Sequence, residues 1–321
     1  MMAFSIHSPN FSTYFLLICS SLFGVSFQET RVSTKNMKFQ LNSGDSIPAV
    51  GFGTFLIEDT ELVHNILDTA LSVGYRLIDT AAYYENEEAI GKALKVLLPK
   101  YNLTRSDIFI TTKLHPSNRG EKAYEGLQQS LRYLDCEYID LYLLHWPGVD
   151  GENLTRSEVK KSRDDGWQQL VRGKKDGLTR NIGVSNYNIR HLTALLKNNH
   201  GIRPALNQVE WHPEYHQNEV LEFCQREGIV LQAYSSLGGT GNTDLMGNPK
   251  VKKIAEKLGK TPAQILLRWA LQQNVAIIPK ARSKEHMEQN IDLNFNIPEA
   301  DMNILSNFER KKYDWDPDTV A

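Results

Sequence analysis

The sequence predicts an α/β fold of the (β/α)8 TIM-barrel class, with an N-terminal β-hairpin. From about residue 37 onward, short runs rich in Ile, Leu and Val alternate with amphipathic helical stretches, and eight strand–helix pairs follow one another. No Pro-, Gly- or Ser-rich linker interrupts the series. The strand runs are largely apolar, which is typical of strands buried on both faces of a parallel sheet. Eight such units in succession predict a closed barrel.

The elements can be placed in chain order. A hairpin is expected where "MKFQL" and "SIPAV" flank the turn "NSGD", within residues 37–50. The first barrel strand is expected at 52–57, and the helix after it should end at Gly74. Between the last two strands, a long helical stretch is expected over residues 248–274. The remaining strands are expected at 76–80, 108–114, 138–146, 180–186, 205–211, 229–237 and 275–281.

An open, doubly wound sheet is the alternative architecture. Such a sheet normally carries a Gly-rich phosphate loop directly after its first strand. The stretch "GFGTF" at 51–55 lacks the G-x-G-x-x-G spacing, and no helix follows it immediately. The closed barrel is therefore the better prediction.

Composition narrows the class of protein. Charged residues make up 23% and apolar residues 41% of the chain, with a formal net charge of −2 and no long basic block. A nucleic-acid partner is not expected from this balance. Cys136 and Cys224 are far apart in the chain and no C-x-x-C motif occurs, which fits a reducing compartment. No His/Cys cluster has the spacing of metal ligands, so no metal is expected.

Residues 1–36 are predicted to be an N-terminal extension, and residues 37–321 the barrel domain. The apolar run at 14–27 is shorter than the roughly 20 residues of a membrane span, and it resembles the core of a signal peptide. The residues before it carry no Lys or Arg, and Met37 offers a competing start. We expect a cytoplasmic protein. Secretion or the ER remains the alternative if residues 1–26 act as a signal peptide, and then Asn102 and Asn153 would be glycan acceptors.

Candidate functional residues lie where the predicted strands end, because several segments of a barrel converge there on one concave face. Asp79 ends its strand and Tyr84 follows shortly after, while Lys113 and His145 lie at the ends of the next two strands. One charged residue at a strand end is usually a loop cap, but three consecutive strands with ionisable ends favour a functional set. Further strand-end candidates are Phe55, Trp146, Ser185, Asn186, Gln208, Tyr234, Ser235 and Lys280.

The four ionisable side chains suit proton transfer. A free phenol has a pKa near 10 and is a poor acid at neutral pH. A lysine ammonium beside Tyr84 would lower the pKa of the phenol, and the Asp79 carboxylate would keep Lys113 charged and oriented. His145 could donate a hydrogen bond to a substrate oxygen. The set predicts a general acid next to a carbonyl-binding site.

From about Met37 to the C-terminus, the chain resembles the aldo-keto reductase superfamily. The resemblance implies a (β/α)8 barrel whose base is closed by the N-terminal hairpin, and NADPH-dependent reduction of carbonyl groups. Each motif is weak alone, but together they are specific. The stretches that carry the resemblance are "LIDTAAYYENEEAIG", "ITTKL", "YIDLYLLHWP", "IGVSNY", "NQVEWHP", "AYSSLG" and "IIPKARSKEHMEQN".

The resemblance implies roles for individual residues. The catalytic aspartate, tyrosine, lysine and histidine of the family fall on Asp79, Tyr84, Lys113 and His145. Substrate would contact Phe55, Tyr84, His145 and Trp146. The positions expected to bind the cofactor are Gly53, Thr54, Asp79, Ser185, Asn186, Gln208, Tyr234, Ser235, Leu237, Lys280, Arg282, His286 and Asn290.

Some positions depart from the family pattern. His286 stands where many relatives have an arginine that meets the adenosine 2′-phosphate, although Arg282 or Lys284 could compensate. Phe55 and His115 stand where tryptophan is common. We expect NADPH to be preferred over NADH, with the strength of that preference left open.

The predicted protein is an NADP(H)-dependent oxidoreductase. Its expected partner is a small carbonyl substrate, and its expected state is a monomer. The alternatives are a non-catalytic barrel that senses nicotinamide cofactors and an aldolase-type enzyme that uses Lys113 as a Schiff-base nucleophile. The sequence does not select among small aldehydes, sugars, steroids or prostanoid-like ketones.

Overall fold

The structure, a computed structural model, describes residues 33–148, 154–239 and 244–320. The signal-peptide hypothesis and the sequon asparagine Asn153 fall on residues outside these ranges and stay predictions, as does the choice of Met1 or Met37 as the start. Within them, no helix has both the length and the apolar composition needed to cross a bilayer.

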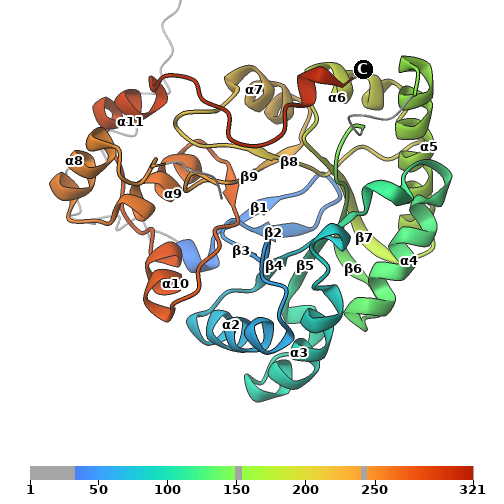
Figure 1. Ribbon diagram of the computed structural model, residues 1–321, viewed down its shortest axis with the longest axis horizontal. Coiled ribbons are helices and arrows are strands. Elements are labelled where there is room, and N and C mark those ends of the chain that lie inside the picture. The colour runs from blue at the N-terminus through green and yellow to red at the C-terminus, as the bar shows by residue number, and fades with distance from the viewer. Residues whose placement is uncertain (1–32, 149–153, 240–243, 321) are drawn as a thin grey trace, which may run out of the picture. The chain divides into compact units, whose positions relative to one another are not determined.

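Parallel strands form a ring in chain order, from β3 to β10, which confirms the predicted barrel (Figure 1). The two ends of the sheet meet at a parallel bridge between Val50 and Ile277. There, Gly51 N donates to Ile277 O at 2.8 Å and Ile277 N donates to Ala49 O at 2.9 Å. The strands are β3 Phe52–Gly53, β4 Leu77–Asp79, β5 Phe109–Leu114, β6 Ile139–Leu144, β7 Thr179–Ser185, β8 Leu206–Glu210, β9 Val230–Tyr234 and β10 Ala276–Ile277.

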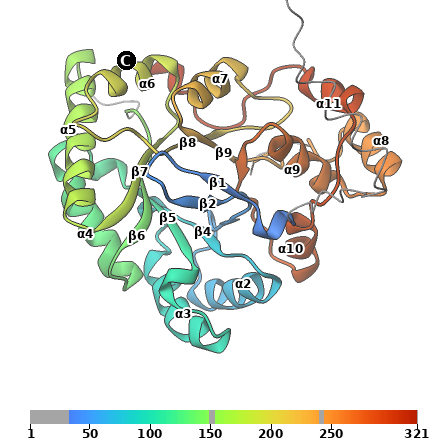
Figure 2. The same cartoon turned by 180° about the vertical axis from the view of Figure 1, so that it is seen from behind.

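Helices surround the ring, as the two opposite views show (Figures 1 and 2). The first of them illustrates how local sequence sets the ends: Asp59 accepts a hydrogen bond from Leu62 N at its start, and Gly74 ends it with φ 113°. The helices are α2 Thr60–Val73, α3 Glu87–Lys100, α4 Ala123–Leu134, α5 Arg156–Lys175, α6 Ile189–Lys197, α7 Asn218–Arg226, α8 Pro249–Leu258, α9 Pro262–Gln272, α10 Lys284–Ile291 and α11 Glu299–Ser306.

The long helical stretch predicted over 248–274 consists of two helices, α8 and α9. Gly259 adopts φ 61° and ends α8. Thr261 then begins α9 with a capping box to Gln264, and Pro262 occupies the first turn. The stretch Gly-Lys-Thr-Pro at 259–262 ends one helix and begins the next, although the apolar periodicity continues through it.

The N-terminal hairpin closes the base of the barrel, as expected. Its strands, β1 Lys38–Gln40 and β2 Ser46–Pro48, pair antiparallel. Ile47 is fully buried and belongs to one apolar cluster with Leu77 and Leu206, the first residues of β4 and β8. The hairpin therefore covers the amino ends of the barrel strands, and Figure 2 shows it lying across the ring.

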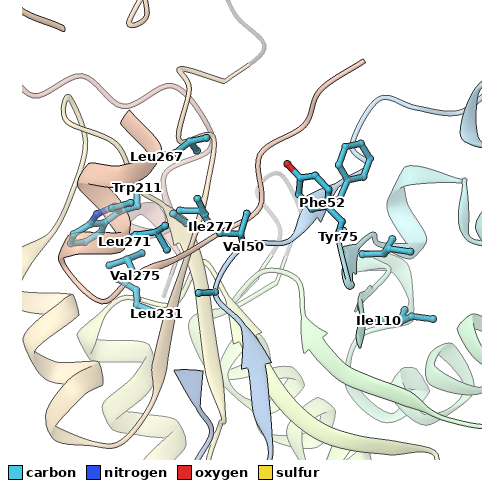
Figure 3. Close-up of a cluster of buried hydrophobic side chains, with 14 of the residues drawn as sticks. Val50, Phe52, Tyr75, Ile110, Trp211, Leu231, Leu267, Leu271, Val275 and Ile277 are labelled. Atoms are coloured by element: carbon cyan, nitrogen blue, oxygen red, sulfur yellow. The ribbon is translucent and has the colours of Figure 1, made fainter. Parts of the chain in front are cut away.

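The main core lies between the strands and the helices. Figure 3 shows part of it, where Leu267 and Leu271 of α9 face Leu231 and Ile277 of the last two strands. Full burial of such a side chain stabilises the fold by about 1.5–3 kcal/mol. This packing fixes the strand ends that carry the candidate site.

Candidate active site

A cavity of about 290 Å³ opens at the carboxyl ends of the strands. It collects residues from widely separated parts of the chain, because all parallel strands end on this face. Thirteen of the residues proposed from the sequence line it: Gly53, Phe55, Asp79, Tyr84, His145, Trp146, Ser185, Asn186, Gln208, Tyr234, Ser235, Leu237 and Lys280.

Lys113 lies directly beneath the cavity and joins two of these residues. Its Nζ donates to Asp79 Oδ1 at 2.6 Å, to Thr80 O at 2.7 Å and to Tyr84 Oη at 3.3 Å. The register of β4 and β5 places Asp79 opposite Thr111, two residues before Lys113 on the same face of the sheet. The structure thus brings together the aspartate, lysine and tyrosine that the strand ends suggested.

The pKa of Tyr84 differs from the prediction. We expected Lys113 to lower it, but burial raises the pKa of the phenol, and the Lys113 charge offsets that rise only in part. The sequence shows the neighbouring cation but not the loss of solvent. Tyr84 therefore keeps its proton at neutral pH, as a proton donor must.

The ion pair behind the phenol is shielded from water, with both side chains almost fully buried. Burial opposes the charge on Lys113, yet Asp79 and Tyr84 raise its pKa above the ordinary value. Burial raises the pKa of Asp79, while Lys113 and a 2.7 Å hydrogen bond from Gln208 Nε2 oppose the rise. Lys113 is therefore a charged donor toward the cavity.

His145 forms a second side of the site. Burial lowers its pKa well below the ordinary value, and the charge of Lys113 adds to this effect. The imidazole is therefore neutral at physiological pH and can act as an N–H donor. Its ring stacks on Trp146 with a centroid separation of 3.7 Å and lies 5.9 Å from the Tyr84 ring.

A chain of amide and hydroxyl groups borders the other end of the cavity. Tyr234 Oη donates to Asn186 Oδ1 at 2.6 Å, and Asn186 Nδ2 donates to Ser185 Oγ and to His145 O, both at 3.1 Å. Asn186 has φ 62°, a left-handed conformation that Asn tolerates better than most residues. The network orients the Tyr234 ring toward the open space.

Four proposed cofactor residues do not line the cavity. Thr54 is buried beneath it, where its hydroxyl donates to Asp79 O at 2.9 Å. Arg282 and His286 are exposed at the start of α10, and Asn290 is buried further along that helix. Arg282 nevertheless acts on a cavity residue, because its charge helps burial to lower the pKa of Lys280.

Sequence reasoning missed several residues of the cavity. Tyr83, passed over in favour of Tyr84, lines it with its ring 5.7 Å from that of Trp146. Asp314 and Trp315 come from the C-terminal tail, and Trp315 meets Trp146 edge-on at 6.4 Å. In the sequence, only the aromatic and acidic composition of the tail pointed to a place for it at the cavity. The other unanticipated lining residues are Ser236, Gly239, Ile278 and Pro279.

Among the residues that the structure describes, no group of three or more His, Cys, Asp or Glu side chains is arranged to hold a metal ion.

Comparison with known proteins identifies the family of the chain. The model of the Aldo/keto reductase family matches residues 49–310. A glyoxal reductase of Bacillus subtilis is 37% identical over 268 residues, covering 83% of this chain and 90% of the relative. The aldehyde reductase YPR1 of Saccharomyces cerevisiae is 35% identical over 289 residues, covering 84% and 90% respectively.

Solved structures of aldo-keto reductases are also similar to this chain. A Bombyx mori aldo-keto reductase in complex with NADP is 33% identical and superposes with a TM-score of 0.77, covering 85% of this chain and 93% of that one. The family match spans most of the barrel and includes every residue of the proposed catalytic set. The chain belongs to the aldo/keto reductase family.

Proposed function

We propose that this protein reduces aldehydes or ketones to alcohols with NADPH, and that Tyr84 is the general acid. The observation that carries the proposal is the contact between Tyr84 Oη and Lys113 Nζ, 3.3 Å apart, at the wall of a cavity that also holds neutral His145. The names of the relatives, a glyoxal reductase and an aldehyde reductase, support aldehydes as the first substrates to test.

The residues of the cavity fit a dinucleotide. Tyr234 offers a ring face, and the buried hydroxyl of Ser236 has no hydrogen-bond partner among the described residues. Lys280 borders the same space, with Arg282 close enough to affect its charge. When bound there, the reduced nicotinamide would supply a hydride, and Lys280 and Arg282 would favour a phosphate on the adenosine ribose.

Each side chain then has a defined task. Tyr84 donates its proton to the substrate oxygen. Lys113 donates a hydrogen bond to the phenol oxygen and stabilises the negative charge that remains there. Asp79 keeps Lys113 charged and oriented. His145 presents an N–H to the carbonyl oxygen and fixes its direction.

The aldolase alternative fits the geometry less well. A Schiff-base lysine needs a neutral amine that substrate can reach. Lys113 is fully buried, donates to three oxygens, and has a raised pKa. These features suit a fixed cation rather than a nucleophile.

Two adjacent tyrosines allow a matched test. NADPH oxidation is measured over a panel of aldehydes and ketones, and again with NADH, for the wild type, Tyr84→Phe and Tyr83→Phe. Loss of a general acid should lower kcat by about 10²–10⁴-fold in Tyr84→Phe. NADPH affinity should stay near the wild-type value in both variants.

Tyr83→Phe loses the same hydroxyl one residue away and should keep kcat within a few-fold of the wild type. Comparable turnover by Tyr84→Phe would remove Tyr84 from the acid role. Absence of NADPH oxidation by the wild type across the panel would instead favour a non-catalytic, cofactor-sensing barrel.

A further inference from the structure

The C-terminal tail crosses the open face of the barrel. It leaves α11, passes α7 and ends near α6 (Figure 1). Lys311 N donates to Glu214 O at 2.7 Å on the way, and His191 Nε2 of α6 lies 3.3 Å from Val320 O. Between these points, Asp314 and Trp315 line the cavity.

A buried carboxylate, Glu210 at the end of β8, holds this part of the tail. Its Oε2 accepts hydrogen bonds from Lys312 Nζ at 2.5 Å and from Asp314 N at 3.1 Å, and its Oε1 accepts from Tyr313 N at 2.7 Å. Tyr313 also stacks on His212, with centroids 4.5 Å apart. Four contacts from three consecutive residues fix the position of the tail.

The anchored tail brings a carboxylate to the loop after β9. Ser235 Oγ donates to Asp314 Oδ2 at 2.7 Å, and both residues line the cavity. Gly239 lies between this loop and the tail, since a Cβ atom placed on it would make ordinary contacts of 3.6 Å with both Ser235 Oγ and Tyr313 Cβ. Asp314 itself is exposed at the rim, so its side chain can turn away without unfolding the tail.

We propose that Asp314 sets the affinity of this protein for its dinucleotide by competing for the Ser235 hydroxyl. The inference rests on the proposed function, in which Ser235 helps to bind the phosphates. A phosphate oxygen and the Asp314 carboxylate are both anionic acceptors, and one hydroxyl hydrogen can serve only one of them. Dinucleotide binding must therefore break the 2.7 Å bond, and the displaced Asp314 carboxylate remains a negative charge near the phosphate.

The test uses Asp314→Asn, which keeps the size and an acceptor oxygen but removes the charge. The matched control is Asp316→Asn, two residues further on, exposed and outside the cavity lining. Dissociation constants for NADPH and for NADP⁺ are measured by fluorescence titration of the full chain, with thermal unfolding as a check on folding.

At low salt, Asp314→Asn should bind both dinucleotides roughly twofold to fivefold more tightly than the wild type, which is the range for an exposed charge. In 1 M NaCl this difference in affinity should shrink, because salt screens the charge. Asp316→Asn should match the wild type. Unchanged or weaker binding by Asp314→Asn would overturn the competition. A gain for NADPH alone would also overturn it, because competition for a phosphate position cannot depend on the redox state of the ring.

The binding measurements distinguish an error in the proposed function from an error in the role of Asp314. If the wild type binds neither dinucleotide, the proposed function is wrong. If the wild type binds them and Asp314→Asn binds no more tightly, the function stands and the role of Asp314 does not.

Discussion

Lys113 Nζ lies 2.6 Å from Asp79 Oδ1, with 0% and 3% of the two side chains exposed. Water cannot compensate either charge if the other is removed, so the pair acts as one unit in stability as well as in the proposed chemistry.

Lys113→Met should destabilise the fold by about 3–5 kcal/mol, because it leaves Asp79 buried without its partner. The double variant Asp79→Asn/Lys113→Met should recover a large part of that loss while remaining inactive. Urea unfolding of the single and double variants measures both effects. A double variant no more stable than Lys113→Met alone would show that the unpaired charge is not the source of the loss.

Lys280→Ala should weaken NADPH binding by roughly tenfold, the effect of losing one hydrogen bond to a charged group, and should change NADH binding much less. The reason is the position of Lys280 at the cavity, beside Arg282. Lys92→Ala is the control, since that exposed lysine lies 2.6 Å from Glu88 and outside the cavity lining. Equal losses for NADH and NADPH would contradict a role in phosphate selection.

Gly53→Ala should destabilise the protein by about 1–3 kcal/mol through overpacking. A Cβ atom at this position would lie 2.6 Å from the backbone oxygen of Ile278, which cannot move aside easily. Gly166→Ala, within α5, would meet nothing closer than 3.5 Å and replaces a poor helix former, so it should be neutral or stabilising. Thermal unfolding measures the change in Tm for each variant. Similar shifts in Tm for the two variants would refute the steric explanation.

Stability should fall as the pH drops from about 6.5 to 4, in part because of His191. Burial lowers its pKa to about 4 in the folded chain, below the ordinary value of 6.5. Between these values the unfolded chain binds a proton that the folded chain does not, so the contribution of His191 is complete above pH 6.5 and is lost toward pH 4.

His191→Gln removes this titration and should flatten the dependence of the unfolding free energy on pH in that window, even if it lowers stability at every pH. An unaltered slope in the variant would assign the acid sensitivity to other groups.

Much of the fold and site follows from local patterns. Apolar runs that alternate with helical stretches were sufficient to predict the barrel, and the strand ends pointed to the group of Asp79, Lys113 and Tyr84 that the structure brings together. The break at Gly259 was missed because the apolar spacing continues across it. Asp314 and Trp315 could not be assigned to the cavity because their position depends on contacts with Glu210, which lies about a hundred residues earlier. The raised pKa of Tyr84 depends on burial, which one sequence does not display.

The ring is completed at its shortest strands, β3 and β10, where few backbone contacts join the first and last units of the barrel. Gly53 and Lys280 stand on opposite sides of this seam and both line the cavity. A molecule that contacts both residues would link β3, the first barrel strand, to the segment after β10, the last. Amide exchange at Gly51 and Gly53, which donate to Ile277 O and Pro279 O across the seam, should therefore slow when the cavity fills.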